Sequence, residues 1–246
     1  MHLILLRHGE SEWNLINQFT GWKDVRLTEN GKKEALFAGH EINKLNLTIN
    51  KVFCSKLVRA KETCDIVCKE INYNVEKVIF DWRLNERHYG KLQGLNKSET
   101  AKKYGEDQVK IWRRSYDIPP PLLKEDDKRH KEICNQFKDI SDDLPRGESL
   151  KNVIDRIKPF WENFNSKSKY NENYLIVGHS NSLRAIVKVL EKLSSQEIID
   201  IEIPTGVPLL YKFNSNFDLQ KKTFLIDEQE LIKKQDLIKN QGKINK

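Results

Sequence analysis

Short, nearly continuous apolar runs that alternate with longer helical patterns constrain the fold of this chain most. A strand that is buried on both faces reads as consecutive apolar residues, because neither face meets water. Several of the stretches between these runs place apolar residues every three or four positions, as a helix does. The expected strands are residues 2–7, 51–54, 76–80, 174–179 and 208–213, and the expected helices are residues 28–42, 57–71, 150–165 and 182–193.

Strands that alternate with helices favour a mostly parallel sheet with helices on both faces. We therefore expect an α/β fold, a three-layer α/β/α sandwich around a mostly parallel central sheet. Because the chain has no internal repeat and no Gly/Ser linker, we expect a single domain over residues 1–246, with a flexible tail at about 233–246. The triple proline 119–121 and the charged stretch after it predict a helical and loop excursion around 95–150.

The net charge of +7 lies mainly on lysines that are scattered among acidic residues, without the aromatic and basic interleaving of a nucleic-acid platform. We therefore expect no nucleic-acid partner. No apolar stretch approaches the ~20 residues of a membrane span, and the apolar run 3–6 is too short for a signal peptide. We expect a cytoplasmic protein without a membrane partner.

The cysteines show no C-x-x-C spacing of a zinc site, and we expect reduced thiols and no metal. Cys64 and Cys68 are four residues apart in a predicted helix, so they share one face. We expect them to be small buried residues rather than a ligand pair.

Two of the predicted strands end in a histidine. They are part of HLILLRHG (2–9) and NYLIVGHS (173–180). Ligands of parallel sheets bind at the carboxyl ends of the strands, so neighbouring strands would bring His8 and His179 to one place.

A phosphoryl group fits such a place. Its oxygens bind guanidinium groups such as that of Arg7, and a neutral imidazole is a competent nucleophile toward phosphorus. We expect Gly9 and Gly178 to let the backbone approach the ligand closely.

The stretch G-H-S-N-S (178–182) also suggests a rival chemistry. It is one residue short of the G-x-S-x-G turn of α/β-hydrolases, in which Ser180 would be the nucleophile of an esterase. That fold places its histidine after the serine, and this chain has no histidine after His179. The esterase interpretation therefore fails, and Ser180 is expected only to face the pocket.

Other strand-to-helix turns and loops supply further candidates for binding a phosphoryl ligand. C-S-K-L-V-R-A (54–60) delivers Arg59 one turn into a helix, and Glu86 stands between two arginines in R-L-N-E-R-H-Y-G (83–90). Arg113 and Arg114 are adjacent beside an aromatic residue. A surface arginine, a structural ion pair and a solvated pair are the alternatives to ligand binding for these residues.

R-H-G-E (7–10) resembles the signature of the histidine phosphatase superfamily. Further stretches, in the same order along the chain, resemble the cofactor-dependent phosphoglycerate mutase family. They are RHGESEWN-x-x-N-x-F-T-G-W-x-D-V-x-L (7–27), LNERHYGKLQGLNK (84–97), WRRSYDIPPP (112–121), LPRGESL (144–150), HSNSLRA (179–185) and IPTGVPL (203–209). The similarity covers nearly the whole chain and is weakest in residues 122–143 and after about residue 225.

The resemblance implies the interconversion of 3-phosphoglycerate and 2-phosphoglycerate through a phosphohistidine enzyme primed by 2,3-bisphosphoglycerate. Minor bisphosphoglycerate synthase and phosphatase activities accompany it. His8 would be phosphorylated, Glu86 would donate and accept the substrate proton, and Arg7, Arg59 and His179 would hold the transferring group. The residues implied to bind the rest of the ligand are Ser11, Asn14, Thr20, Gly21, Tyr89, Lys97, Arg113, Arg114 and Asn181, with Ser180 facing them.

This chemistry sets two requirements on protonation. His8 must be neutral to attack, and like charge on Arg7 and Arg59 lowers its pKa in that direction. Glu86 must be able to hold a proton. A catalytically silent binding protein on the same fold would need neither residue, so their presence argues against that alternative.

A plain phosphatase and an enzyme specialised to make bisphosphoglycerate are the nearer alternatives. A mutase needs a second site for carboxylate and phosphate, and Lys97, Arg113 and Arg114 supply one. Relatives specialised to make bisphosphoglycerate tend to carry Gly at the position of Ser11 and Cys-Ser at Thr20-Gly21. These positions favour the glycolytic mutase.

The chain departs from the family pattern at Ser180, where the family usually has Gly. A Cβ and hydroxyl there either crowd the phosphate or donate to it. The divergent segment 122–143 alters the mouth of the site, and the lysine-rich tail 233–246 corresponds to the region that closes the pocket in the family. The resemblance also implies a homodimer or homotetramer.

Overall fold

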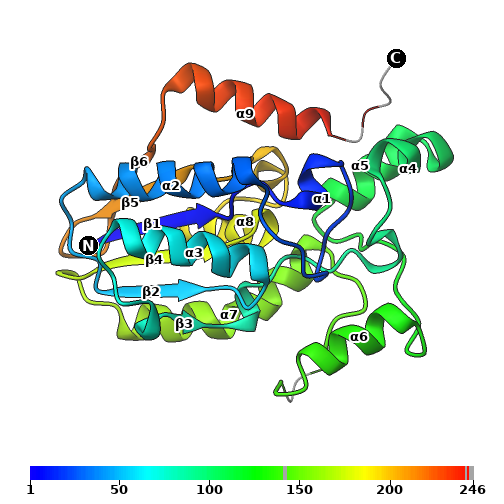
Figure 1. The fold of residues 1–246 in the computed structure, drawn as a ribbon, viewed down its shortest axis with the longest axis horizontal. Coiled ribbons are helices and arrows are strands. Elements are labelled where there is room, and N and C mark those ends of the chain that lie inside the picture. Colours follow the sequence, from blue (N-terminus) through cyan, green and yellow to red (C-terminus); the bar gives the residue numbers. More distant parts are fainter. Residues whose placement is uncertain (141–142, 242, 244–246) are drawn as a thin grey trace.

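The structure is a computed structural model, and it describes residues 1–140, 143–241 and 243. Within these residues the chain forms a six-stranded sheet in the order β3-β2-β4-β1-β5-β6, with helices on both faces (Figure 1). The strands are β1 (His2–Arg7), β2 (Lys51–Cys54), β3 (Ile79–Phe80), β4 (Asn173–Gly178), β5 (Pro208–Phe213) and β6 (Leu219–Phe224). The α-helices are α1 (Glu12–Leu15), α2 (Glu29–Asn43), α3 (Val58–Glu70), α4 (Lys97–Tyr104), α5 (Glu106–Arg114), α6 (Lys128–Gln136), α7 (Leu150–Lys167), α8 (Ser180–Leu190) and α9 (Glu228–Asn240).

The centre of the sheet is parallel. β1 pairs with β4 and β2 pairs with β4 and β3 in parallel, whereas β5 and β6 run antiparallel at one edge. The register sets Arg7 opposite Gly178 at the ends of β1 and β4. The prediction of a mostly parallel sheet is confirmed, and the residues that follow these two strands emerge side by side.

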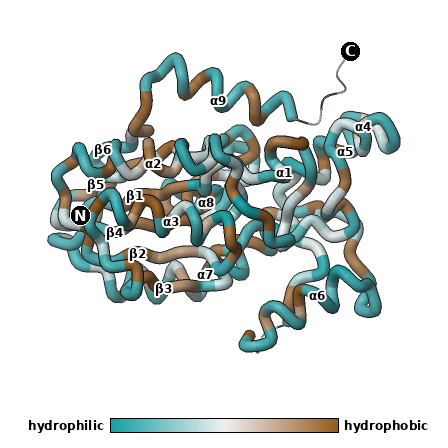
Figure 2. Tube along the Cα trace, viewed as in Figure 1, coloured by the Kyte–Doolittle hydropathy of each residue, from teal (hydrophilic) through white to brown (hydrophobic). Residues whose placement is uncertain are grey.

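The alternation of side chains along β1 builds two separate cores. Leu3 and Leu5 pack in the cluster that includes α7 and α8, whereas Ile4 and Leu6 pack in the cluster that includes α2 and α3. Figure 2 shows the apolar central strands enclosed between these helices. The predicted three-layer sandwich is confirmed, as is the burial of Cys64 and Cys68, whose Sγ atoms lie 3.8 Å apart.

The predicted excursion around 95–150 contains α4, α5 and α6. These helices lie beyond the carboxyl ends of the parallel strands (Figure 1). α9 lies on the side of α2, where the Lys234 Nζ atom lies 2.7 Å from Glu34 Oε1 (Figure 1). Residues 233–240 of the expected tail therefore belong to a helix, while 242 and 244–246 lie outside the described residues. The flexibility of the tail stays a prediction.

The predicted elements differ from the structure most clearly in three places. The strand expected at 76–80 is only Ile79–Phe80, because Asn74 caps a 3-10 turn at Val75–Lys77. β6 was not predicted, since the residues of Leu219–Phe224 are largely exposed and carry no apolar run. α8 begins at Ser180, two residues earlier than expected. No helix in the part of the chain that the structure describes is long and apolar enough to cross a membrane.

Candidate active site

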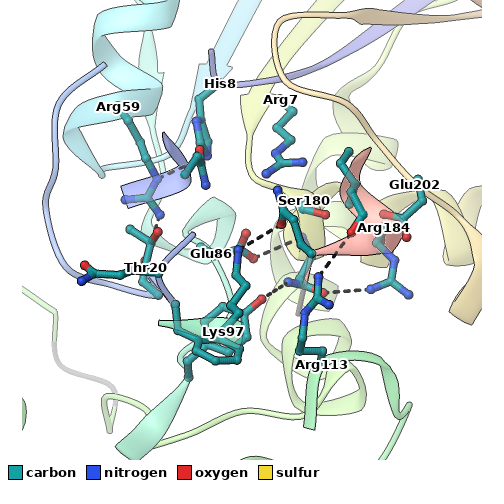
Figure 3. A pocket seen from close by; sticks show the side chains of 18 of the residues that line it. Arg7, His8, Thr20, Arg59, Glu86, Lys97, Arg113, Ser180, Arg184 and Glu202 are labelled. Atoms are coloured by element: carbon teal, nitrogen blue, oxygen red, sulfur yellow. Dashed lines mark hydrogen bonds between the residues drawn. The ribbon is translucent and has the colours of Figure 1, made fainter. Parts of the chain in front are cut away.

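A small cavity of about 50 Å³ opens to solvent at the carboxyl ends of β1 and β4 (Figure 3). It is lined by most of the residues that the sequence indicated. These are Arg7, His8, Asn14, Thr20, Gly21, Arg59, Glu86, Tyr89, Lys97, Arg113, Arg114, Ser180 and Asn181. Ser11 and His179 were also expected at the site, but both are buried behind this lining.

His8 directly follows β1 and is 2% exposed. Its Nδ1 atom lies 2.7 Å from the carbonyl oxygen of Gly9. Because a carbonyl can only accept, Nδ1 carries the proton and Nε2 keeps its lone pair. Arg59 Nε donates to that Nε2 at 3.3 Å. Nε2, the His8 nitrogen beside Arg59, is thus the one able to attack an electrophile.

Burial holds the pKa of His8 well below its usual value, and the neighbouring charges of Arg59 and Arg7 lower it further. The predicted lowering is confirmed in direction, with burial as its largest cause. The imidazole is therefore neutral at physiological pH.

His179 caps α8 and lies against His8, with 4.9 Å between the ring centroids. Its Nε2 atom is 2.7 Å from Ser55 Oγ, which in turn donates to Asn85 Oδ1 at 2.9 Å. Since a hydroxyl has one proton, the His179 Nε2–H donates to Ser55. In this tautomer Nδ1 carries no proton, so it can accept but not donate a hydrogen bond.

The two arginines beside His8 are held by backbone carbonyls. Arg7 Nη1 donates to the Ile203 carbonyl at 2.9 Å, and Arg59 donates to the carbonyls of Gly21 at 2.9 Å and Lys23 at 3.1 Å. Burial lowers the pKa of Arg59 to about 10, so the group remains charged at neutral pH. Both guanidinium groups are fixed before any ligand arrives.

Glu86 sits in a tightly supported loop and is 6% exposed. Its Oε1 atom accepts backbone N–H groups from Arg87 at 2.7 Å and from Asn181 at 3.1 Å. Oε2 is therefore the oxygen available to hold a proton. The Glu86 carbonyl accepts from the indole N–H of Trp22 at 2.6 Å and from Arg156 Nη2 at 3.2 Å.

A second group of cations lies away from His8, at the ends of α4 and α5. The Lys97 Nζ atom donates to Gln241 Oε1 at 3.0 Å, and Arg113 Nη2 donates to the Ile238 carbonyl at 3.4 Å. Burial lowers the pKa of Lys97 well below its usual value, with Arg113 adding to the effect, and burial lowers the pKa of Arg113 to about 10. The adjacent arginines are thus not a solvated pair.

Other expected residues shape the cavity or its supports. Ser11 caps α1 through a reciprocal pair of bonds, in which the Asn14 backbone N–H donates to Ser11 Oγ at 3.3 Å and the Ser11 backbone N–H donates to Asn14 Oδ1 at 3.1 Å. Gly21 has a φ of 56°, a backbone conformation that favours glycine. The Asn181 side chain donates to the Tyr89 hydroxyl at 3.3 Å.

A Cβ on either glycine next to the histidines would meet atoms of the protein itself, and the expected close approach of a ligand to these backbone positions stays a prediction. A Cβ on Gly9 would lie 2.1 Å from the Gly31 carbonyl oxygen. A Cβ on Gly178 would lie 3.1 Å from Ser182 Oγ. These positions lack side chains because helices pack directly on the ends of the strands.

The cavity also contains residues that the sequence did not indicate. They are Gln18, Phe19, Arg184, Glu202, Ile238 and Gln241. Arg184 stood inside a quoted motif, HSNSLRA, which was a usable signal. Nothing in the local sequence marked Glu202, because long-range folding brings it there.

Charge in the cavity is strongly unbalanced. Six cationic side chains and two carboxylates contribute to the lining. Among the residues that line the cavity, the Nε atoms of Arg7 and Arg184 are buried donors without a hydrogen-bond partner in the described parts of the chain. A small ligand with several anionic groups fits these unpartnered donors.

The family model described as histidine phosphatase superfamily (branch 1) matches residues 3–127 and 122–215. The chain belongs to this superfamily. Solved structures show the same fold at low identity. A mycobacterial glucosyl-3-phosphoglycerate phosphatase in complex with VO3 has a TM-score of 0.68 and 21% identity, covering 91% of this chain and 96% of that chain. The alpha-ribazole phosphatase of Shigella flexneri has a TM-score of 0.64 and 20% identity, covering 90% and 95%.

Curated relatives of this histidine phosphatase are much closer in sequence. A protein of Treponema denticola named 2,3-bisphosphoglycerate-dependent phosphoglycerate mutase is 49% identical over 245 residues, which cover 99% of each chain. A Bacteroides fragilis protein of the same name is 46% identical over 243 residues, which cover 98% of each. The narrower resemblance seen in the motifs is thus confirmed over the full length.

Proposed function

We propose that this chain is a phosphoglycerate mutase that interconverts 3-phosphoglycerate and 2-phosphoglycerate. The single observation that carries the proposal is the second group of cations, Lys97, Arg113 and Arg114, facing the same cavity as His8. A phosphatase needs one anion site, whereas a mutase must hold a phosphoglycerate by a second acidic group while its phosphoryl group is exchanged. The closely similar mutases of two bacteria support the same activity.

In the proposed priming step His8 Nε2 forms a bond to a phosphorus of 2,3-bisphosphoglycerate as the bond between that phosphorus and its ester oxygen breaks, which releases a monophosphoglycerate. Glu86 gives its proton to that oxygen. In the return step the other hydroxyl gives its proton to Glu86, its oxygen attacks phosphorus, and the bond to His8 breaks. 2,3-Bisphosphoglycerate supplies the phosphoryl group that primes His8.

Arg7, Arg59 and His179 surround the place where the phosphoryl group transfers. Phosphoryl transfer asks a protein mainly for alignment and charge stabilisation. Donors that are already in position contribute roughly 3 to 4 kcal/mol each to transition-state stabilisation where water is excluded. The carbonyl contacts of Arg7 and Arg59 supply such positioning.

The remaining expected residues bind the rest of the ligand in this proposal. Asn14, Thr20, Gly21, Tyr89, Ser180 and Asn181 form the walls between the two cation groups, and Ser11 orients Asn14 from behind. The hydroxyl of Ser180, at the first position of α8, is available as an extra donor to the phosphoryl group.

An enolase-coupled assay with and without 2,3-bisphosphoglycerate tests this function. Isomerisation that depends on the primer supports the mutase. Phosphate release without isomerisation would support a plain phosphatase, and accumulation of bisphosphoglycerate as the main product would support the synthase. Absence of all of these reactions would support a silent binding protein.

We propose that the reaction needs no metal ion, because six cationic side chains supply the positive charge that phosphoryl transfer requires. Activity should be unchanged by an excess of EDTA. Loss of activity that returns with a divalent cation would overturn this.

We also propose that the chain forms a homo-oligomer through the β3 edge of the sheet. Ile79 and Phe80 are 46% and 41% exposed there, on an edge strand with unpaired backbone groups. Light scattering should give a dimer or tetramer, and Phe80→Asp should shift the mass toward the monomer.

A further inference from the structure

Glu202 is a buried carboxylate in a cavity that otherwise collects positive charge. Its side chain is 3% exposed, and its Oε1 atom lies 2.5 Å from Arg114 Nη2. Its other oxygen, Oε2, is buried with no hydrogen-bond partner in residues 1–140, 143–241 and 243. Figure 3 shows Glu202 beside Arg184 at the margin of the cavity, well apart from Arg59. An anion in this position works against the binding of an anionic ligand.

The backbone around Glu202 is held independently of the carboxylate. Its own carbonyl accepts from Gln235 Nε2 at 3.3 Å, and the next carbonyl, that of Ile203, accepts from Arg7. These bonds tie the segment to α9 and to β1 through main-chain atoms. The negative charge of Glu202 is therefore not needed to hold the loop, which leaves the pairing with Arg114 as its evident effect.

We propose that Glu202 is a specificity-determining residue that holds Arg114 in the free enzyme and competes with the ligand for it. An acidic group of the ligand must take the guanidinium from Glu202, and the carboxylate then remains in the cavity as a repelling charge. The repulsion grows with the charge of the ligand, so Glu202 disfavours the bisphosphate relative to the monophosphate. This inference rests on the proposed function, because it takes phosphoglycerates as the ligands.

The size of the effect follows from the charges. A second phosphate adds about 1.5 to 2 negative charges at neutral pH. At an effective dielectric of about 20, a unit charge about 12 Å away changes a binding constant by about tenfold. Replacing Glu202 by the isosteric Gln should therefore tighten bisphosphoglycerate binding about thirtyfold more than 3-phosphoglycerate binding. Because the pair is buried, 0.15 M salt should reduce this difference only slightly.

Two other roles for Glu202 predict results that differ from this tightening of ligand binding. If Oε2 accepted a hydrogen bond from a ligand hydroxyl, Glu202→Gln would weaken the binding of both ligands. If the ion pair served only the fold, the variant would lower the unfolding temperature and leave the dissociation constants unchanged.

The experiment measures dissociation constants of 3-phosphoglycerate and 2,3-bisphosphoglycerate by calorimetry on the full chain. All proteins carry His8→Asn, so that binding is not followed by phosphoryl transfer. The matched control is Glu191→Gln, which removes the same charge from an ion pair with Lys222 at 2.8 Å, at the far end of α8. A further pair of proteins carries Arg114→Ala, one with Glu202 kept and one with Glu202→Gln, and the two are compared with each other.

The expected result is a preference for bisphosphoglycerate that rises at least about tenfold in Glu202→Gln and stays unchanged in Glu191→Gln. The preference should also rise in the Arg114→Ala background, because the carboxylate repels the ligand whether or not Arg114 is present. Unchanged or weaker binding in Glu202→Gln would overturn the inference, as would the absence of any gain in the Arg114→Ala background. Failure of the proposed function is seen separately, as the absence of isomerisation by the unsubstituted chain in the primed assay.

Discussion

Replacing Arg156 by Met should destabilise the fold and displace the proposed proton donor. The Arg156 side chain is 6% exposed, and it forms a two-pronged ion pair with Glu148, with Nε at 2.7 Å from Oε1 and Nη2 at 3.1 Å from Oε2. It also donates to the carbonyls of Arg83 at 2.7 Å and Glu86 at 3.2 Å. One side chain thus holds both a buried carboxylate and the loop that carries Glu86.

The magnitude follows from what Met leaves behind. Removing one partner of a buried ion pair strands the other charge and costs about 3–5 kcal/mol of unfolding free energy. For a chain of this size, that corresponds to a loss of roughly 6–20 °C in unfolding temperature. A shift of the Glu86 carboxylate by about 1 Å would lower kcat by up to about a hundredfold.

Chemical denaturation and the primed mutase assay measure the two effects. The control is Arg26→Met, since Arg26 is 76% exposed and its ion pair with Glu62 is worth at most about 1 kcal/mol. If Arg156→Met lost no more stability than this control and kept its kcat, the supporting role assigned to Arg156 would be refuted.

Further predictions concern the reaction and its pH dependence. Glu86→Gln keeps the Oε1 acceptor but cannot exchange a proton, so kcat should fall by about 10² to 10⁴ while ligand affinity, measured by calorimetry, stays within a few-fold; unchanged mutase turnover would contradict the assignment. His8→Ala should abolish acid-labile labelling by bisphosphoglycerate, and persistent labelling of an imidazole would point to His179. Burial holds the pKa values of His8 and His179 well below the usual value and that of His88 at about 3, so each takes up a proton on unfolding below about pH 6.5. Unfolding free energy should therefore fall by about 4 kcal/mol between pH 7.5 and 5.5 in urea titrations, and by about a third less in His8→Asn. A flat profile in this range would count against the buried neutral imidazoles.

The central sheet was predictable because its signal is local. A strand buried on both faces must be apolar at consecutive positions, and β1, β2 and β4 satisfy that rule. β6 lies at the sheet edge with exposed side chains, so its sequence, LQKKTF, carries no such signal. The 3-10 turn at Val75–Lys77 was missed because an Asn cap, which depends on the backbone path, ended the apparent strand.

The site also contains residues that could be predicted from the sequence and residues that could not. His8 and His179 could be paired from sequence because parallel strands end at the same edge of a sheet. Arg59, Glu86, Arg113 and Arg114 were distinguishable from surface charges mainly through their motifs. Glu202 could not be found, because only the path of the chain after α8 brings this otherwise ordinary acidic residue against Arg114.

Because the charge of the cavity is unbalanced, the free energy of unfolding of this protein should depend on which anions the buffer contains. Any small anion that relieves the mutual repulsion of the buried cations binds the folded chain and not the unfolded one. At a hundredfold excess over its dissociation constant, such an anion adds about 2.7 kcal/mol to the free energy of unfolding. Phosphate and sulfate buffers should therefore raise the unfolding temperature above its value in chloride at equal ionic strength, and removing cavity cations one at a time should shrink that difference.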